Sequence, residues 1–183
     1  RGVPGRDPQG EERKGESGVR TIKAVPITNE NFRPYGAFAS MLNPTGNCFP
    51  GEGSAFYPDP VQLFVSGNVQ IAFSPLTVDK PEKMVVTKSE YHNHTGEGIF
   101  FLDDDAVLHV APPSSHVITP RKTEAFIVPK GTLVKLNTGV WHLSPFPIHN
   151  RVLHLMIIMP ERVYGNDCIV CDYPEADHME IVL

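Results

Sequence analysis

The sequence lacks several features that would place the chain in a large class of proteins. No apolar run approaches the about 18–20 residues of a transmembrane helix, which excludes a helical membrane protein. Lysine and arginine number 16 against 21 aspartate and glutamate residues, and the formal net charge is −5. Proteins that bind nucleic acid or anionic membrane surfaces carry a basic face, so we expect neither partner here.

Cysteines are few. The three present, Cys48, Cys168 and Cys171, are an odd number and do not suggest a disulfide framework. Cys168 and Cys171 have CxxC spacing, but no second Cys or His pair accompanies them, so we interpret the pair as structural rather than as a zinc or redox site. A secretory signal is also missing at the start of the sequence. These absences predict a soluble, cytoplasmic protein.

Long helical patterns are missing too, and short apolar runs take their place. Eighteen prolines disfavour long helices and suit strand edges. Thr28 is predicted to cap a helical turn over 28–32, and the Pro- and Gly-rich segment 43–60 is predicted to be a loop. Many short strands with turn residues between them predict an all-β sandwich or closed barrel. The predicted strands cover 21–26, 37–40, 61–65, 69–73, 84–87, 99–102, 107–110, 124–128, 132–136 and 152–158.

The first twenty residues differ from the rest of the chain. Two valines are their only aliphatic side chains, and the segment is rich in Gly, Arg and Glu, so it cannot bury enough apolar surface to become ordered. The sequence also lacks an initiating Met. We therefore expect a disordered tail or a non-native remnant over 1–20 and one domain over 21–183.

One stretch carries the residue types of a catalytic or metal site. Glu90, His92 and His94 alternate in a strand-like pattern, so their side chains are predicted to lie on one face. After a Thr-Gly break, Glu97 begins the next apolar run, and His142 begins another strand. Carboxylates and imidazoles that converge inside a small β-barrel would form a metal or acid/base site.

These residues resemble the two motifs of the cupin superfamily. There, His-x-His is followed after three or four residues by Glu, and a second motif supplies one more His. Here Glu90-x-His92 is followed after four residues by Glu97, and Gly139–His142 (GVWH) is similar to the second motif. The resemblance implies a cupin-type β-barrel, a double-stranded β-helix or jelly roll with short helical turns. His94 becomes a neighbour of the site at the barrel mouth.

A closer resemblance runs from about Ile22 to the C-terminus. In order and spacing, its segments are similar to those of the ureidoglycolate lyase family, cupin-fold enzymes of allantoin catabolism, part of purine degradation. The resemblance implies a homodimeric lyase that releases urea and glyoxylate from ureidoglycolate, a small carboxylate. The segments are Pro26-Ile27, Phe32-x-x-Tyr35-Gly36, Gly53-Ser54-x-Phe56, Glu90-Tyr91-His92 with Glu97, Ala125-Phe126-Ile127, Gly139–His142 and Gly165-Asn166-Asp167-Cys168.

Three positions depart from the family pattern. Ser74 stands where an arginine is expected, Asn137 where the family often has His, and Leu143 where a second His is common. An arginine would hold a substrate carboxylate through a bidentate pair, so its absence leaves either ureidoglycolate or a related small hydroxy acid as the expected substrate. A metal-dependent isomerase or lyase acting on a sugar acid and a non-catalytic small-molecule-binding cupin stay open as alternatives.

The resemblance and the residue chemistry together assign roles. Release of urea needs a base for the hydroxyl proton and an acid for the departing nitrogen: His142 suits the base, and Glu97 or Glu90 suits the acid if burial raises its pKa. His92 completes the predicted catalytic set. His92, Glu97 and His142 are also the predicted metal ligands, so we expect the site to need either no cofactor or one divalent metal ion. Substrate contacts are predicted for Tyr91, His94, Asn137 and Trp141.

Two further features are given structural roles. A lone histidine on a strand, such as His109, is interpreted as a packed or solvent-facing residue. The run Asp103–Asp105 precedes a strand and is interpreted as a solvated hairpin turn.

Overall fold

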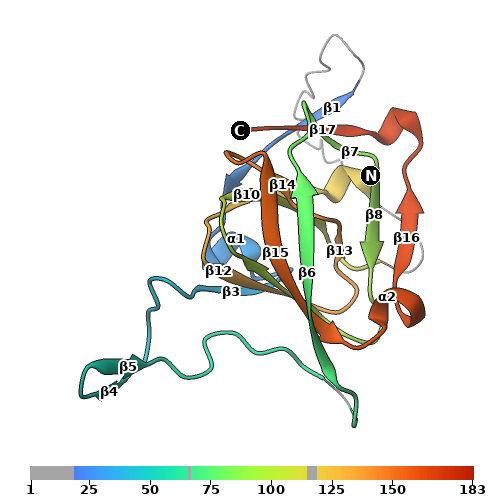
Figure 1. Cartoon of the computed structure of the whole chain (residues 1–183). Helices are drawn as coiled ribbons and strands as arrows, with labels where there is room; N and C mark the ends of the chain where they lie inside the picture. Colours follow the sequence, from blue (N-terminus) through green and yellow to red (C-terminus); the bar gives the residue numbers. More distant parts are fainter. Residues whose placement is uncertain (1–18, 66, 115–118) are drawn as a thin grey trace, which may run out of the picture.

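A computed structural model describes residues 19–65, 67–114 and 119–183. Strands dominate these residues, and the helices are single turns (Figure 1). The strands are β1 (Arg20–Lys23), β2 (Val25–Pro26), β3 (Gly36–Ser40), β4 (Phe49–Gly51), β5 (Ser54–Phe56), β6 (Ile71–Asp79), β7 (Met84–Val86), β8 (Lys88–Tyr91), β9 (Glu97–Phe101), β10 (Ala106–Ala111), β11 (Glu124–Val128), β12 (Thr132–Leu136), β13 (Trp141–His142), β14 (Phe146–Pro147), β15 (Val152–Pro160), β16 (Ile169–Asp172) and β17 (Met179–Val182). The α-helices are α1 (Asn29–Phe32) and α2 (Val163–Asn166), and the 3₁₀ turns are η1 (Pro120–Lys122) and η2 (Glu175–Asp177).

Two large sheets form the body of the molecule. One has the order β3-β12-β9-β15-β6, and the other has the order β16-β8-β13-β10-β11-β2 with β14 paired to β10. A three-stranded sheet, β1-β17-β7, and the isolated hairpin β4-β5 complete the topology. Strand pairing stays within these separate sheets over the described ranges, so the predicted all-β jelly roll is confirmed as a sandwich and not as a closed barrel.

The core lies between the two large sheets because alternate strand residues point inward from both. β9 contributes Ile99 and Phe101, and β10 contributes Leu108 and Val110, all at most 1% exposed. Burying an apolar side chain of this size contributes about 1.5–3 kcal/mol, so these positions carry much of the stability. Further core residues lie on β11 (Phe126, Val128), β12 (Val134, Leu136) and β15 (Leu153, Leu155).

α1 closes this core at one edge. The predicted cap is confirmed, since Thr28 Oγ1 accepts a hydrogen bond from the backbone N–H of Asn31 at 3.2 Å. The turn places Phe32 in the core, where its ring meets Phe126 edge-on at 5.4 Å between centroids. Tyr35 follows and donates a hydrogen bond to Glu124.

Several local predictions were wrong. The apolar run 61–65 forms no strand, and the predicted loop 43–60 contains the hairpin β4-β5. Asp104 is not a solvated turn residue: it is 3% exposed, and its carboxylate accepts the backbone N–H groups of His149 and Asn150. It thereby joins two loops that no short-range pattern connects. The predicted tail over 1–20 lies outside the described residues except for Val19 and Arg20, and Arg20 begins β1. No described helix has the length and apolarity needed to cross a membrane.

β10 is buried on both faces because the small sheet β1-β17-β7 covers its outer side. This places His109 in an apolar layer where its ring stacks near Phe146, with centroids 5.8 Å apart. Neither ring nitrogen has a hydrogen-bond partner among the described residues. Burial and the nearby charge of His142 lower the pKa of His109 to about 3.

The buried imidazole of His109 predicts an acid-sensitive stability. The unfolded residue titrates near pH 6.5, so between about pH 6.5 and pH 3 the unfolded state binds the extra proton and the folded state does not. The free energy of unfolding should therefore fall with decreasing pH in this window, by up to ~1.4 kcal/mol per pH unit from this group. Urea denaturation of wild type and His109→Leu at pH 7, 6 and 5 measures it. Equal pH slopes for the two proteins would refute the assignment.

Candidate active site

Four titratable side chains converge at one end of the sandwich. β8 carries Glu90, which is paired with His142 of β13, while Glu97 begins β9 and His92 follows β8 directly. Their ligand atoms all lie within 4.8 Å of one another. The structure thus brings together the four residues that the sequence analysis assigned to catalysis, and their catalytic roles stay a prediction.

Two glycines allow these segments to approach. A Cβ on Gly96 would lie 2.4 Å from the carbonyl oxygen of Leu136, so only glycine fits directly before Glu97. Gly139 has φ +80°, a left-handed conformation, and its N–H donates to the carbonyl of His92 at 2.8 Å. The turn that leads to His142 is therefore hydrogen-bonded to the segment that carries His92.

Asp167 fixes the segment around His92. Its carbonyl oxygen accepts from His92 Nδ1 at 2.6 Å, and its carboxylate accepts the backbone N–H groups of Asn93 and His94, both at 2.8 Å. The chain therefore leaves the strand after Tyr91 and turns. The prediction that His94 shares a strand face with Glu90 and His92 was wrong, because β8 ends first and His94 is exposed.

The backbone also sets the protonation of both buried histidines. A carbonyl only accepts hydrogen bonds, so His92 Nδ1 must carry a proton toward Asp167, and His142 Nδ1 must carry one toward the carbonyl of Val140 at 2.9 Å. In a neutral imidazole this leaves the lone pair on Nε2. Both Nε2 atoms face Glu97 Oε2, at 3.1 Å from His92 and 2.8 Å from His142.

This arrangement favours the protonated form of both histidines and the ionised form of Glu97. Burial opposes charge on each histidine, but the hydrogen bond and charge of Glu97 outweigh it, and the pKa of both His92 and His142 is raised. Burial opposes ionisation of Glu97 as well, yet the two histidines lower its pKa to about 2. Glu97 is therefore ionised at neutral pH, so the condition stated for Glu97 as the acid, a pKa raised by burial, is not met.

The same donor set fits one divalent metal ion. Two cis ligands with metal bonds of about 2.1 Å at right angles lie about 3.0 Å apart, close to the observed separations around Glu97 Oε2. Metal-bound histidines usually donate their other N–H to a carbonyl or carboxylate, as His92 and His142 do. Two imidazoles with carboxylates suit Zn²⁺, Fe²⁺ or Mn²⁺. Glu90 is a fourth candidate ligand.

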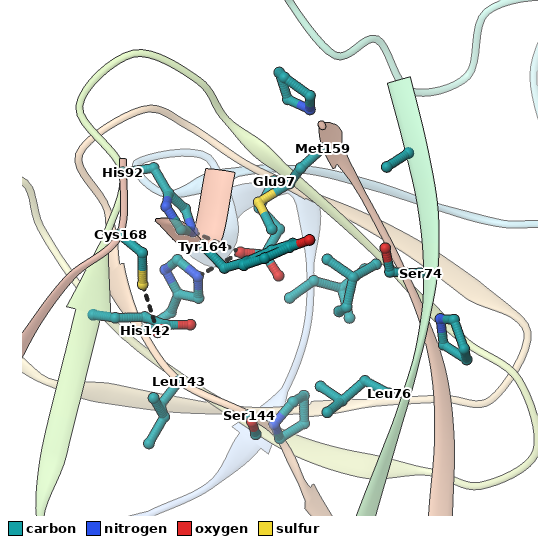
Figure 2. Close-up of a pocket in the computed structure, with 17 residues that line it drawn as sticks. Ser74, Leu76, His92, Glu97, His142, Leu143, Ser144, Met159, Tyr164 and Cys168 are labelled. Carbon is teal, nitrogen blue, oxygen red and sulfur yellow. Dashed lines mark hydrogen bonds and ion pairs between the residues drawn. The ribbon is translucent and has the colours of Figure 1, made fainter. Parts of the chain in front are cut away.

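The cluster forms one wall of a cavity of about 290 Å³ (Figure 2). His92, His142 and Cys168 lie on one side of this space, with Glu97 next to them, and Ser74 and Leu76 lie across it. Leu143 and Ser144, which follow His142, also line the cavity. A space of this size suits a small molecule.

Comparison with known proteins decides the family. A family model described as ureidoglycolate lyase matches residues 19–180. The chain belongs to the ureidoglycolate lyase family. The resemblance stated from the sequence is thereby confirmed, and with it the assignment to a family of lyases. The two facing sheets are the cupin-type architecture expected of this family.

The other comparisons add little to this assignment. Curated protein sequences gave no match. One similar solved structure is that of Bacillus subtilis oxalate decarboxylase, reported in work on its Mn(II) centres. It is 17% identical with a TM-score of 0.39, and the match covers 56% of this chain and 23% of that chain. The matched part is thus less than a quarter of the length of that protein.

Sequence reasoning missed Cys168 in this member of the ureidoglycolate lyase family. Its thiol lines the cavity and donates a hydrogen bond to Glu90 Oε2 at 3.1 Å. Burial, the hydrogen bond and the charge of Glu90 raise the pKa of the thiol to about 12, so it stays protonated. Cys168 belongs to the Gly165–Cys168 segment that carried the family resemblance, and this was the one signal available. Cys171 instead packs against the apolar cluster of Tyr91, Ala111 and Trp141.

Four residues predicted to bind substrate are not among those that line the cavity. Tyr91 and Trp141 are buried and pack against each other, with ring centroids 4.3 Å apart. Asn137 accepts a hydrogen bond from Lys135 Nζ at 2.6 Å, and His94 is exposed. Tyr91 and Trp141 are each adjacent in sequence to a site histidine, and neighbouring side chains on a strand point to opposite faces, so both point away from the cavity. Substrate contact by these four residues stays a prediction.

The hydrogen bond from Cys168 predicts a graded effect on turnover. Cys168→Ala removes the donor that orients Glu90, and a hydrogen bond to a charged group is worth about 1.5–3 kcal/mol, so kcat should fall about 10–100-fold. Cys168→Ser keeps a donor and should recover most of the activity. Steady-state kinetics and metal content of both variants test this. Equal loss in Ala and Ser variants would show that the thiol does not act through its donor.

Proposed function

We propose that this chain is a carbon–nitrogen lyase that binds one divalent metal ion through His92, Glu97 and His142. Its substrate is a small hydroxy acid with nitrogen on the hydroxyl-bearing carbon, as in ureidoglycolate. The observation that carries the proposal is the convergence of two Nδ1-protonated histidines on one ionised carboxylate, beside Glu90, at a cavity wall. The membership of the ureidoglycolate lyase family supports the reaction type.

The protein groups divide the chemistry between them. A bound divalent ion would chelate the substrate carboxylate and hydroxyl and lower the pKa of that hydroxyl. His92, Glu97 and His142 hold their donor atoms together for this, since the carbonyls of Asp167 and Val140 keep the Nε2 lone pairs directed inward. When His92, Glu97 and His142 hold the metal ion, their donor atoms are not available for proton transfer.

Glu90 is left as the acid/base group. Its carboxylate faces the cavity and is held by the protonated thiol of Cys168. It takes the hydroxyl proton as the carbon–nitrogen bond breaks and delivers the same proton to the departing nitrogen, so the products are an aldehyde acid and a neutral amide or urea. No co-reactant is needed. Proton transfer by one positioned carboxylate typically contributes about 10²–10⁴-fold.

Glyoxylate formation tests the proposal. Purified protein loaded with Zn²⁺ or Mn²⁺ should release glyoxylate from ureidoglycolate or from other N-substituted α-hydroxyglycines faster than the spontaneous reaction. His149→Ala is the matched control, because it removes an exposed histidine that does not line the cavity. Absence of turnover with every such acid, in protein that holds the metal, would contradict the proposal.

A sugar acid is a poorer candidate as substrate. Its hydroxyl groups would need several polar partners, and beyond the titratable cluster the cavity offers the hydroxyls of Ser74, Ser144 and Tyr164. Most of the remaining lining is apolar. The chemistry of the lining therefore favours an acid with few hydroxyl groups.

We also propose that two copies of the chain associate. The β4-β5 hairpin extends away from the body of the molecule, and within the described ranges its two strands pair only with each other (Figure 1). Phe49 and Phe56 stack on it and are each 65% exposed, and Phe64 on the returning segment is 81% exposed. In a closed two-fold dimer, the hairpin of each copy would be buried against the other copy.

The hairpin makes the dimer testable. Exposed aromatic side chains are frequent interface anchors, so Phe49→Ser with Phe56→Ser should weaken self-association at least about 10-fold. Sedimentation of wild type and the double variant over a range of concentrations measures this. Glu52→Gln, at the hairpin turn, is the control. A wild-type chain that stays monomeric at high concentration would refute the proposal.

A further inference from the structure

The residues that line the cavity fall into two groups, one titratable and one largely apolar. Its charged groups all belong to the cluster of Glu90, His92, Glu97 and His142. None of the 17 lining residues is lysine or arginine. The rest of the lining, called the apolar wall below, consists largely of aliphatic side chains and prolines, among them Ala72, Pro75, Leu76, Ile157, Met159 and Pro160.

This division does not suit a substrate that is polar at both ends. In ureidoglycolate the carboxylate and hydroxyl lie at one end, and the terminal ureido amine at the other. With the acid end at the cluster, that amine would point toward Leu76 across the cavity, whose side chain offers it no acceptor (Figure 2). A polar group that loses water without gaining a partner weakens binding.

An apolar group at the same place would instead be favoured by burial. Ser74 lies on this wall between Phe73 and Pro75, and its hydroxyl faces the cavity, where it can donate to a carbonyl next to the departing nitrogen. The wall therefore fits an acyl group: a carbonyl near Ser74, then a hydrocarbon chain or ring against Leu76 and Ile157. Ser74 occupies the position where the sequence pattern led us to expect an arginine.

We infer that the substrates are N-acyl-α-hydroxyglycines with an apolar acyl group, R–CO–NH–CH(OH)–COO⁻. This inference rests on the proposed lyase function and narrows its substrate class. The bond between nitrogen and the hydroxyl-bearing carbon breaks, the hydroxyl oxygen becomes the aldehyde oxygen of glyoxylate, and its proton passes to nitrogen. The products are glyoxylate and the primary amide R–CO–NH₂, with no change of oxidation state and no co-reactant.

Kinetics with a matched series of substrates test the inference. N-benzoyl- and N-hexanoyl-α-hydroxyglycine are compared with ureidoglycolate in metal-loaded wild-type protein, with glyoxylate and the amide product both quantified. We expect kcat/KM at least about 100-fold higher for the acyl compounds, the size of effect that a hydrophobic pocket gives. Equal or better turnover of ureidoglycolate overturns the inference and leaves the lyase proposal intact. Release of glyoxylate from none of the three overturns both.

Binding gives a second readout that does not depend on turnover. N-benzoylglycine and N-carbamoylglycine lack the hydroxyl and cannot react, and calorimetry should show about 100-fold tighter binding of the benzoyl compound. Leu76→Asn should reduce this preference at least about 10-fold, because it places an amide on the apolar wall. Unchanged preference in Leu76→Asn, with the variant folded by circular dichroism, would show that this wall does not contact the acyl group.

Discussion

Glu97→Gln should remove the metal ion and, with it, turnover. Glu97 Oε2 is the atom on which both histidine Nε2 atoms converge, and its carboxylate is ionised with a pKa lowered to about 2. Replacing groups that only orient metal ligands typically costs about 10–100-fold in metal affinity, so loss of a direct ligand should exceed 100-fold. Metal content after dialysis should fall from about one ion per chain in wild type to a small fraction.

The control for this experiment is Glu175→Gln, which neutralises an exposed carboxylate in η2. It should keep metal and turnover. His142→Asn provides a second route to the same outcome, since it removes one Nε2 donor and leaves Glu97 in place. Metal bound at wild-type level in both site variants, each with a cooperative melting transition, would show that the ion, if held, lies elsewhere.

Glu90→Gln should give the opposite combination: metal retained and turnover lost. Its carboxylate is held by Cys168 rather than by the histidines, so the three remaining donors stay in place. An amide cannot carry the proton from the hydroxyl to the departing nitrogen, so kcat should fall by about 10²–10⁴-fold. Substrate affinity should change little, because Gln keeps the size and shape of Glu.

The comparison of the two variants separates the assigned roles. Steady-state kinetics are measured beside metal content on the same preparations. Loss of metal in Glu90→Gln as complete as in Glu97→Gln would make Glu90 a ligand and return the proton transfer to another group. Retention of wild-type kcat in Glu90→Gln would exclude it as the acid/base residue.

Short-range patterns in the sequence predicted much of the fold. Apolar runs bounded by turn residues marked β9 to β12 closely, because each of these strands is largely buried and its apolar residues contrast with the turn residues that flank it. The hairpin β4-β5 was missed because it lies among Pro and Gly residues and buries no face. The run 61–65 has the apolar residues of a strand, but no neighbouring strand pairs with it, and pairing cannot be read from a single segment.

Only part of the site was predicted, because contacts between distant segments cannot be read from short-range patterns either. The motif spacing indicated that Glu90, His92, Glu97 and His142 belong to one site. In the fold, their convergence depends on the pairing of β8 with β13. Residues that approach from other parts of the chain were not found: Cys168 and Asp167 contact the site over more than 70 residues of sequence. The direction of the Glu97 pKa was also missed, because it depends on two imidazoles at hydrogen-bond distance and not on burial alone.

X-ray diffraction from crystals grown with Zn²⁺, with data collected on both sides of the zinc absorption edge, tests the central claim most directly. The account predicts one anomalous peak in the cavity, within about 2.0–2.2 Å of Nε2 of His92, Nε2 of His142 and Oε2 of Glu97. A cavity without such a peak, in protein whose release of glyoxylate is unaffected by chelators, would contradict it.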